Sequence, residues 1–347
     1  MKNTAAVMTG LREMELREIP VPTVAPGEVL VKIEYVGICG SDLHYYEQGR
    51  IGDFVVEGDF ILGHECAGTV VGISDDVTTL KVGDRVALEP GKTCGKCEYC
   101  KTGRYNLCPY VEFLATPPYD GCLMNYIAFP AELSFKLPDG VSTKEGALIE
   151  PLAVGLEAAS VSSVSIGDSV AILGSGCIGL CTMLACKARG ASMVIMVDVI
   201  ERRLEKAKEL GADVVINAAR EDVEARIAEL TGGAGTDKVI ETAGNVKTAQ
   251  QTIDLVKRGG EILIVGMGAE DNFPFNFGKF MSKVASIKTI FRYKNQFPVA
   301  LAAVSSGQID IKKIVTNEFS FEDSAEAFER SIEDKANIVK AVIKINE

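Results

Sequence analysis

The feature that most constrains the fold is a glycine-rich turn at residues 174–179, which reads GSGCIG. An apolar strand is predicted directly before it, at Val170–Leu173, and an apolar helix directly after it, at Ile178–Arg189. A GxGxxG pattern alone is weak support, because 34 of the 347 residues are glycine. Between a strand and a helix, however, the pattern predicts a βαβ unit whose turn binds a dinucleotide.

Each glycine of the turn has a physical role in such a unit. Gly174 permits the tight turn, Gly176 lets a pyrophosphate approach the backbone, and Gly179 lets helix and strand pack closely. The helix N-terminus then offers N–H groups and a partial positive charge to the phosphates. Asp198 stands nineteen residues beyond Gly179, at the end of the next predicted strand, where it would bond the ribose hydroxyls of the cofactor.

The residues around this aspartate bear on the choice between NAD and NADP. Arg202 and Arg203 follow closely, and an arginine there could accommodate a 2′-phosphate. The carboxylate of Asp198, however, stands where that phosphate would go. We therefore predict NAD as the cofactor.

Two kinds of pattern divide the chain. Residues 1 to about 150 carry short alternating runs such as EVLVKIEYVG and CAGTVVGI, which predict a mostly antiparallel β domain. From about residue 160 strands and helices alternate, which predicts a parallel sheet with helices on its faces. The last sixty residues could complete this sheet or return to the first domain. The further elements expected in the alternating region are Met193–Val197, Glu201–Leu210, Val214–Ile216, Lys238–Glu241, Ile262–Val265 and Ile287–Phe291.

Composition argues against several classes of function. The net charge of −12 argues against nucleic acid and anionic membranes as partners, because these need clustered Lys and Arg. No apolar run approaches the ~20 residues of a spanning helix. The N-terminal stretch MKNTAAVMTG also lacks the apolar core of a signal peptide. We therefore expect a cytoplasmic protein.

Four of the ten cysteines crowd one short run, CGKCEYCKTGRYNLC. Their spacing can close a tetrahedral thiolate shell around one zinc ion, which leaves no position for water or substrate. We therefore predict a structural zinc site. A disulfide pair is the alternative that a reducing cytosol disfavours, and exposed free thiols would oxidise easily. The four cysteines are Cys94, Cys97, Cys100 and Cys108.

A sparser set predicts a second metal site. Cys39 in GICGSD, with His64 and Glu65 in LGHE, offers sulfur, imidazole and carboxylate, which suit a catalytic zinc with one open position. Adjacent ligands would point to opposite faces of a regular strand, so we expect a bend, which Gly63 makes easier. Taken singly, a core histidine and a small buried cysteine are the simpler interpretations. A nicotinamide site in the same chain favours the metal.

Together these motifs resemble a known family. GICGSD, LGHE, the four-cysteine lobe, IEP and the later GxGxxG turn resemble the zinc-dependent medium-chain dehydrogenases over essentially the whole chain. HYYEQGRIGDFVV, GRYNLCP, FLATPPYDG, ALIEPLAVG and IFRYKNQFPVA resemble the polyol branch, which comprises sorbitol (L-iditol 2-) and xylitol dehydrogenases.

The resemblance implies an architecture. A GroES-like, mostly β catalytic domain would cover residues 1–155, with the structural zinc lobe at about 90–110. A Rossmann domain, a doubly wound parallel sheet, would cover 156–290, and residues 291–347 would return to the catalytic domain. The resemblance also implies a homo-oligomer, a tetramer, with zinc at both metal sites.

The resemblance further assigns roles to individual residues. Glu150 of IEP would lie beside the water of the catalytic zinc, as an alternate ligand or a proton acceptor. The residues implied in the polyol site are Tyr45, Phe113, Thr116, Glu150, Arg292 and Tyr293. The residues implied in cofactor binding, besides the turn glycines, are Ile178, Asp198, Arg203, Val265, Gly266, Met267, Ile290, Phe291 and Arg292. One departure stands out, because Glu157 occupies a position where relatives commonly carry a histidine.

The predicted reaction is the reversible oxidation of a secondary polyol hydroxyl to a ketone, with hydride transfer to NAD⁺. Ser41 and His44 would relay the proton to solvent, and Glu150 is a competing acceptor. For Ser41 the alternative is a turn hydroxyl bonded to backbone, and for His44 a packing residue. Alternative enzymes are threonine, butanediol and galactitol 1-phosphate dehydrogenases. A regulatory protein that binds NADH without turnover is the alternative outside enzymes.

Overall fold

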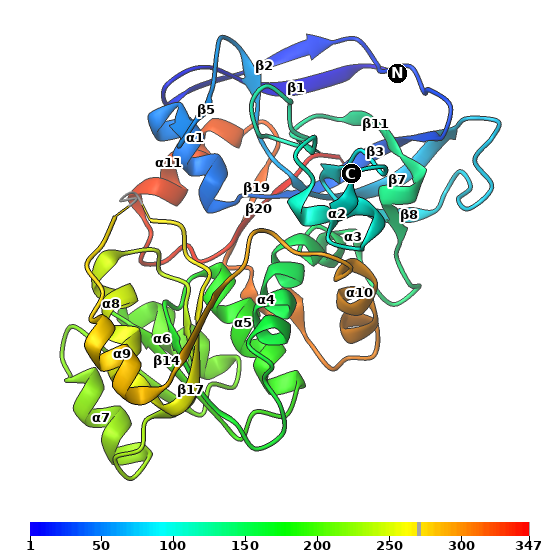
Figure 1. Cartoon of the computed structure of the whole chain (residues 1–347). Helices are drawn as coiled ribbons and strands as arrows, with labels where there is room; N and C mark the ends of the chain where they lie inside the picture. The colour runs from blue at the N-terminus through cyan, green and yellow to red at the C-terminus, as the bar shows by residue number, and fades with distance from the viewer. Residues whose placement is uncertain (269–271, 347) are drawn as a thin grey trace. The chain divides into compact units, whose positions relative to one another are not determined.

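The computed structural model describes residues 1–268 and 272–346 (Figure 1). It divides into two compact units, the first comprising Met1–Glu150 with Phe297–Glu347 and the second Pro151–Gln296. The divisions fall a few residues from the expected boundaries after residues 155 and 290. Within the described residues, no helix combines the length and the apolar character needed to cross a bilayer.

A seven-stranded sheet forms the centre of the first unit, in the order β12–β8–β7–β3–β20–β19, with β11 also paired to β3. Strands β3 (Glu28–Gly37) and β7 (Glu65–Ile73) pair antiparallel over most of their length, as the two alternating runs predict. The other strands are β8 (Arg85–Leu88), β11 (Tyr126–Pro130), β12 (Ser134–Lys136), β19 (Asn317–Ser320) and β20 (Ala341–Lys344).

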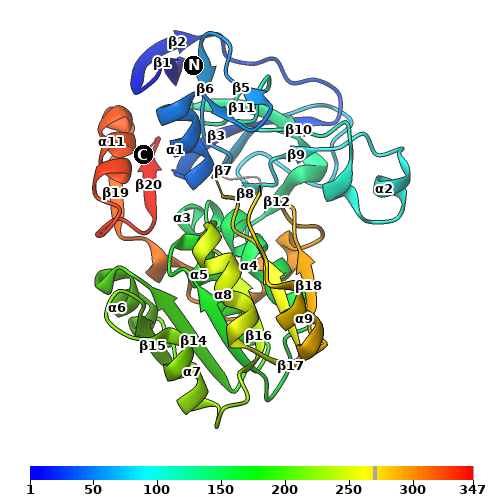
Figure 2. The ribbon, with the colours of Figure 1, turned by 60° about the vertical axis from the view of Figure 1, so that its left-hand side comes forward.

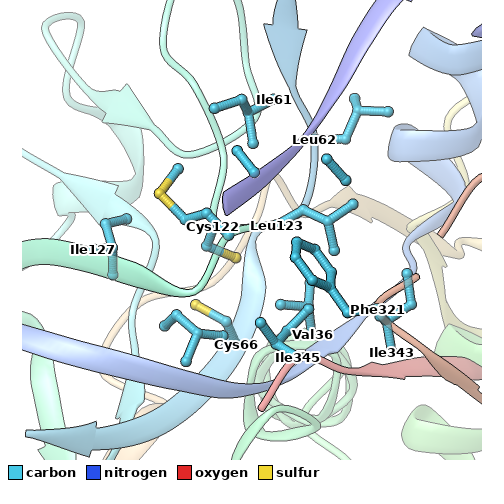
Figure 3. Packing of buried hydrophobic residues seen from close by; sticks show 14 of the residues in the cluster. Val36, Ile61, Leu62, Cys66, Cys122, Leu123, Ile127, Phe321, Ile343 and Ile345 are labelled. Carbon is cyan, nitrogen blue, oxygen red and sulfur yellow. The ribbon is translucent and has the colours of Figure 1, made fainter. Parts of the chain in front are cut away.

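The last residues of the chain return to this first unit. Strand β20 pairs antiparallel with β3 and parallel with β19, so the end of the chain lies inside the sheet. Figure 3 shows the result: Val36 of β3, Cys66 of β7 and Ile343 of β20 pack in one apolar core. Helix α11 (Ser324–Glu333) adds the fully buried Phe328 to that core.

Shorter elements complete the first unit. A second sheet orders its three strands β2–β1–β6. The strands outside the large sheet are β1 (Asn3–Gly10), β2 (Glu13–Ile19), β4 (Arg50–Ile51), β5 (Phe54–Val55), β6 (Phe60–Ile61), β9 (Gly91–Lys92) and β10 (Glu112–Phe113). The α-helices are α1 (Gly40–Gln48), α2 (Glu98–Lys101), α3 (Thr143–Gly146) and α10 (Phe297–Ser305), and α4 (Ile149–Val161) begins at the division. The 3₁₀ helices are η1 (Tyr105–Leu107), η2 (Ala131–Leu133) and η3 (Ile311–Ile314).

Six parallel strands form the second unit, in the order β15–β14–β13–β16–β17–β18, with helices packed against them (Figure 2). The order reverses between β13 and β16, as in doubly wound dinucleotide-binding sheets, so the predicted fold class is confirmed. The strands are β13 (Ser169–Leu173), β14 (Met193–Asp198), β15 (Val214–Asn217), β16 (Thr236–Glu241), β17 (Val256–Ile264) and β18 (Ser286–Thr289). The helices are α5 (Cys177–Ala188), α6 (Glu201–Glu209), α7 (Val223–Leu230), α8 (Val246–Leu255) and α9 (Phe277–Lys283).

Two of the predicted strands run past their observed C-terminal ends, and β17 also begins at Val256, six residues before its predicted start at Ile262. Strand β17 stops at Ile264. The N–H of Val265 makes the last ladder bond, to the carbonyl of Glu241, and the N–H of Gly266 donates to the same carbonyl, which ends the regular alternation. Strand β18 stops at Thr289, two residues before the predicted end. The hydrogen bond that follows it, from Ile290 N to Ile264 O, is already long at 3.4 Å.

Candidate active site and metal centres

Three predicted metal ligands come together in the first unit. Cys39, His64 and Glu65 offer ligand atoms within 4.8 Å of one another. Cys39 is the N-cap of α1, His64 precedes β7, and Glu65 begins it. Gly63 has a φ of 90°, which supplies the expected bend before the two adjacent ligands. One sulfur, one imidazole and one carboxylate fit a zinc site with three protein ligands and one open position.

A buried aspartate that the motifs did not single out supports this cluster. Asp42 accepts hydrogen bonds from Cys39 N and Gly63 N, both at 3.0 Å, and its carboxylate lies 3.3 Å from Nδ1 of His64. A carboxylate at one ring nitrogen fixes the imidazole and leaves the other nitrogen for a metal. The available signal was local, since Asp42 is an acidic residue three positions after the N-cap of a helix.

The charges around His64 favour a cation. Burial alone would lower the pKa of His64, but the neighbouring Asp42 and Cys39 raise that pKa well above its ordinary value. Burial likewise opposes ionisation of Asp42, and its charge interaction and hydrogen bond with His64 nonetheless lower its pKa. The negative groups that favour a proton on the imidazole would also favour a metal cation in place of that proton.

Lys340 is a second residue that the motifs missed. It is almost fully buried, forms an ion pair with one oxygen of Glu65, and donates to the carbonyl of Ile38 at 2.9 Å. The pair holds one carboxylate oxygen in place, and a carboxylate has a second oxygen to offer. Lys340 lies 275 residues from Glu65, so no local pattern connects them.

The other residues predicted in the first unit lie at different depths. The buried Phe113 packs against His64, with ring centroids 5.6 Å apart, and Thr116 N donates to its carbonyl at 3.1 Å. Tyr45 is buried edge-on against Phe60.

Helix α1 carries the two residues predicted to relay a proton. Ser41 is half-buried and His44 is exposed, so the imidazole is accessible to solvent. Glu150 is buried at the start of α4 and is not a member of the three-residue cluster that the described residues form. Its catalytic role stays a prediction.

The four lobe cysteines also converge. Their sulfurs lie within 4.8 Å of one another, with 3.4 Å between Cys97 and Cys100 and 3.9 Å between Cys94 and Cys100. Sulfurs of a tetrahedral zinc site are ~3.8 Å apart, given a ~2.3 Å Zn–S bond. The backbone N–H of Lys96 is the main cause that lowers the pKa of Cys94 to about 6. All ten cysteines are free thiols in this structure, which argues against the disulfide alternative.

The glycine-rich turn of the second unit has the geometry that a dinucleotide requires. Gly174 has a φ of 105°, and a Cβ on Gly179 would lie 2.0 Å from the carbonyl oxygen of Gly174. Gly176 is the N-cap of α5, and the nearest atom to its missing Cβ is a guanidinium nitrogen of Arg203 at 3.9 Å. The turn is therefore open at the position where the phosphates would approach, with a cation beside it. Half-buried Ile178 follows in the first turn of α5.

Asp198 ends β14 beside this turn. One of its oxygens accepts from Ser175 N at 2.7 Å, and the other accepts from Val199 N at 2.8 Å and Ile200 N at 3.0 Å. Three backbone donors fix the carboxylate before any ligand arrives.

The residues that follow β16 and β17 lie against one another beside a small pocket. A Cβ on Gly266 would lie 2.3 Å from Gly244 N, and one on Gly244 would lie 2.6 Å from Met267 O. The two backbones therefore touch, and a small pocket lined by Glu241, Gly244, Gly266 and Phe273 lies beside them. The sequence interpretation overlooked Gly244, although a glycine shortly after a strand in ETAGN was an available signal.

The remaining predicted contacts of the second unit follow its last two strands. Val265, Ile290 and Arg292 are half-buried, whereas Met267 and Phe291 are exposed. The guanidinium of Arg292 lies 4.8 Å from the ring centroid of Phe291, and Tyr293 is buried.

The chain matches two family models. Residues 25–139 match the alcohol dehydrogenase GroES-like domain, and residues 177–306 match the zinc-binding dehydrogenase domain. The chain is 45% identical to a sorbitol dehydrogenase of Bacillus subtilis, over 99% of this chain and 97% of the relative. It is 47% identical to the uncharacterised zinc-type alcohol dehydrogenase-like protein YdjJ of Escherichia coli, over the whole of both chains.

Among solved structures, the chain resembles an Escherichia coli oxidoreductase/dehydrogenase of unknown specificity, with 46% identity, a TM-score of 0.96 and full coverage of both chains. The resemblance stated from the motifs is thus confirmed. With both domains matched and the relatives aligned end to end, the chain belongs to the zinc-binding alcohol dehydrogenase family and is an oxidoreductase that acts on alcohols.

Proposed function

We propose that this enzyme reversibly oxidises a secondary hydroxyl of a polyol, of the sorbitol, xylitol or L-iditol type, to the ketose with NAD⁺. The observation that carries the chemistry is the mixed cluster of Cys39, His64 and Glu65, whose three ligands would leave the fourth position of a tetrahedral zinc for the substrate. The similarity to a sorbitol dehydrogenase over nearly the whole chain supports the substrate class. We also propose two zinc ions per chain and a homotetramer.

The bound groups would supply the reactive centres: zinc lowers the pKa of the substrate hydroxyl and NAD⁺ accepts the hydride. The chain's own residues would bind and orient the substrate and carry its proton away. Phe113 places an apolar ring against the imidazole of His64, at an angle of 56° between the ring planes. The Ser41 hydroxyl would accept the substrate proton as it gives its own proton to His44, and the exposed His44 would release a proton to solvent.

Polar side chains would select the substrate. Tyr45, Arg292 and Tyr293 can each bond a hydroxyl, and a site built in this way rejects substrates that lack one. For the cofactor, the fixed carboxylate of Asp198 would accept hydrogen bonds from the ribose of NAD⁺ and disfavour NADP⁺.

A substrate panel tests the proposal. Sorbitol, xylitol and L-iditol are compared with L-threonine, 2,3-butanediol and galactitol 1-phosphate, each with NAD⁺ and with NADP⁺, while reduced cofactor is followed at 340 nm. We expect the highest kcat/KM for a polyol with NAD⁺.

Two results would contradict the proposal. Turnover of threonine, butanediol or galactitol 1-phosphate without any polyol would move the enzyme to another branch of the family. Tight NADH binding without turnover of any alcohol by the zinc-loaded protein would support the regulatory alternative.

A further inference from the structure

Glu157 connects helix α4 to the segment that carries two of the proposed polyol ligands. The residue is only 4% exposed, and both of its carboxylate oxygens have partners. Lys294 Nζ lies 2.6 Å from Oε1, and Gln296 Nε2 donates to Oε2 at 2.7 Å. All three residues belong to the second unit.

The segment held by Glu157 is the link between β18 and α10. Within it Arg292 and Asn295 both have a φ of 57°, in the left-handed region that non-glycine residues rarely adopt. Such conformations persist only where their surroundings hold them. Lys294 and Gln296 lie on either side of Asn295 and follow Arg292 by two and four positions, so the two contacts with Glu157 hold the chain around Asn295 and just after Arg292.

A third contact ties strand β18, which precedes this segment, to helix α4. Lys288 Nζ, on β18, donates to the carbonyl of Val161 at the end of α4, at 3.0 Å. Helix α4 therefore holds the segment on both sides of Arg292 and Tyr293. Of these contacts, the one with Glu157 involves a buried carboxylate, which is costly to bury without such partners.

We infer that Glu157 is a positioning residue for substrate selection. By holding Lys294 and Gln296 it places Arg292 and Tyr293, and thereby makes the enzyme prefer polyols over alcohols without neighbouring hydroxyls. This inference rests on the proposed function, because it takes Arg292 and Tyr293 to be polyol ligands. A histidine at this position could not accept from both partners at once, so this mode of holding the segment needs the carboxylate.

Steady-state kinetics of four variants test the inference. Glu157→Ala, Glu157→Gln, Lys294→Met and the double variant Glu157→Ala with Lys294→Met are compared with the unchanged enzyme, using sorbitol and butan-2-ol with NAD⁺. Lys187→Met is the matched control, because it removes an exposed ion pair, with Asp213, in the same unit.

The expected pattern separates positioning from general damage. We expect Glu157→Ala to raise the KM for sorbitol about tenfold or more, with kcat little changed and kcat/KM for butan-2-ol preserved. Glu157→Gln keeps an acceptor for one partner and should recover part of the loss. The double variant should have a KM for sorbitol no higher than that of Glu157→Ala alone, because both substitutions break the same contact between Glu157 and Lys294. Lys187→Met should leave the kinetic constants for both substrates unchanged.

Two results would overturn the inference. If Glu157→Ala lowers activity on sorbitol and butan-2-ol by the same factor, Glu157 is merely structural. If sorbitol kinetics do not change, Glu157 does not position the segment. Should Glu157→Ala not fold, Glu157→Gln and Lys294→Met decide in the same way. Failure of the unchanged enzyme to oxidise any polyol would contradict the proposed function instead. The substrate panel with the unchanged enzyme measures this separately.

Discussion

At the residue scale, Asp198 shows how backbone geometry can set cofactor choice. Its two oxygens accept from Ser175, Val199 and Ile200, so the carboxylate cannot turn away from an incoming ribose. A 2′-phosphate at this position would meet a fixed negative charge, which costs several kcal/mol. A guanidinium nitrogen of Arg203 lies near the same turn, 3.9 Å from the missing Cβ of Gly176, and is a cation that a phosphate could meet there.

We therefore predict that Asp198→Asn weakens the preference for NAD⁺. The substitution removes the charge and keeps one of the two acceptor oxygens, so the backbone donors on one side of the group lose their partner. The ratio of kcat/KM with NAD⁺ to that with NADP⁺ should fall about tenfold or more, as like-charge repulsion disappears. Initial rates at varied cofactor concentration give the ratio directly.

Asp213→Asn serves as the control, since Asp213 is an acid of the same unit that pairs with Lys187. Its ratio should stay unchanged. An unaltered ratio in Asp198→Asn would mean that another residue discriminates between the cofactors.

Single residues also show what the sequence could and could not reveal about the site. Cys39, His64 and Glu65 stand in short motifs, and a metal needs them together, so their convergence was predictable. Asp42 was within reach of the same reasoning, because its signal is local to α1. Lys340 was not, because only the pairing of β20 with β3 brings it to Glu65.

At the element scale, the lobe of β9, α2 and η1 has little apolar packing of its own. Its α2 helix and η1 helix contain no buried residue, and of the four cysteines only Cys108 is buried. Backbone N–H groups of the lobe point at sulfur, among them Cys94 N at Cys108 Sγ (3.5 Å) and Cys97 N at Cys94 Sγ (3.3 Å), and other internal contacts are short-range hydrogen bonds between neighbouring residues. A segment of this kind depends on its metal for stability.

We predict that the two metal sites fail differently. The unchanged protein should hold about two zinc ions per chain, and Cys39→Ser and Cys97→Ser about one each. Cys39→Ser should lose nearly all activity with a similar melting temperature, because α1 and β7 do not depend on the metal for packing. Cys97→Ser should lower the melting temperature, with activity lost only as a consequence. Zinc content by mass spectrometry, thermal unfolding and kinetics on the same samples check this.

Cys186→Ser is the matched control, a buried cysteine in α5 that lies outside both clusters, and it should keep both zinc ions. A folded, thermally unchanged Cys97→Ser protein that has lost only hydride transfer would reverse the assignment of the two sites.

Element existence was easier to predict than element ends. The strands of the second unit follow from their apolar runs, but β17 ends where Val265 and Gly266 find the carbonyl of Glu241 on a neighbouring strand. β18 likewise ends just before Arg292 leaves the β region. Both limits come from tertiary contacts, which a pattern along the chain does not contain.

At the scale of the whole molecule, the first unit is discontinuous in sequence. Strand β20 lies between β3 and β19, and Phe321, Phe328 and Ile343 belong to the same core as residues of β3 and β7. Burying three such side chains contributes roughly 5–9 kcal/mol, which is comparable to the whole stability of a typical domain at about 5–15 kcal/mol. The second unit, by contrast, has its own sheet and its own core.

We therefore predict that fragments of the chain differ in whether they fold. Residues 149–296 should unfold cooperatively and bind NADH, with Asp198→Asn weakening that binding. Residues 1–148 should not fold, because the edge of β3 lacks β20 and Glu65 lacks Lys340. The same residues joined to 297–347 by a flexible linker should fold and hold about two zinc ions, without binding NADH. Circular dichroism, calorimetric titration with NADH and zinc content distinguish the three fragments. A cooperatively folded fragment 1–148 that holds both metals would show that the return of the chain is dispensable to the metal centres.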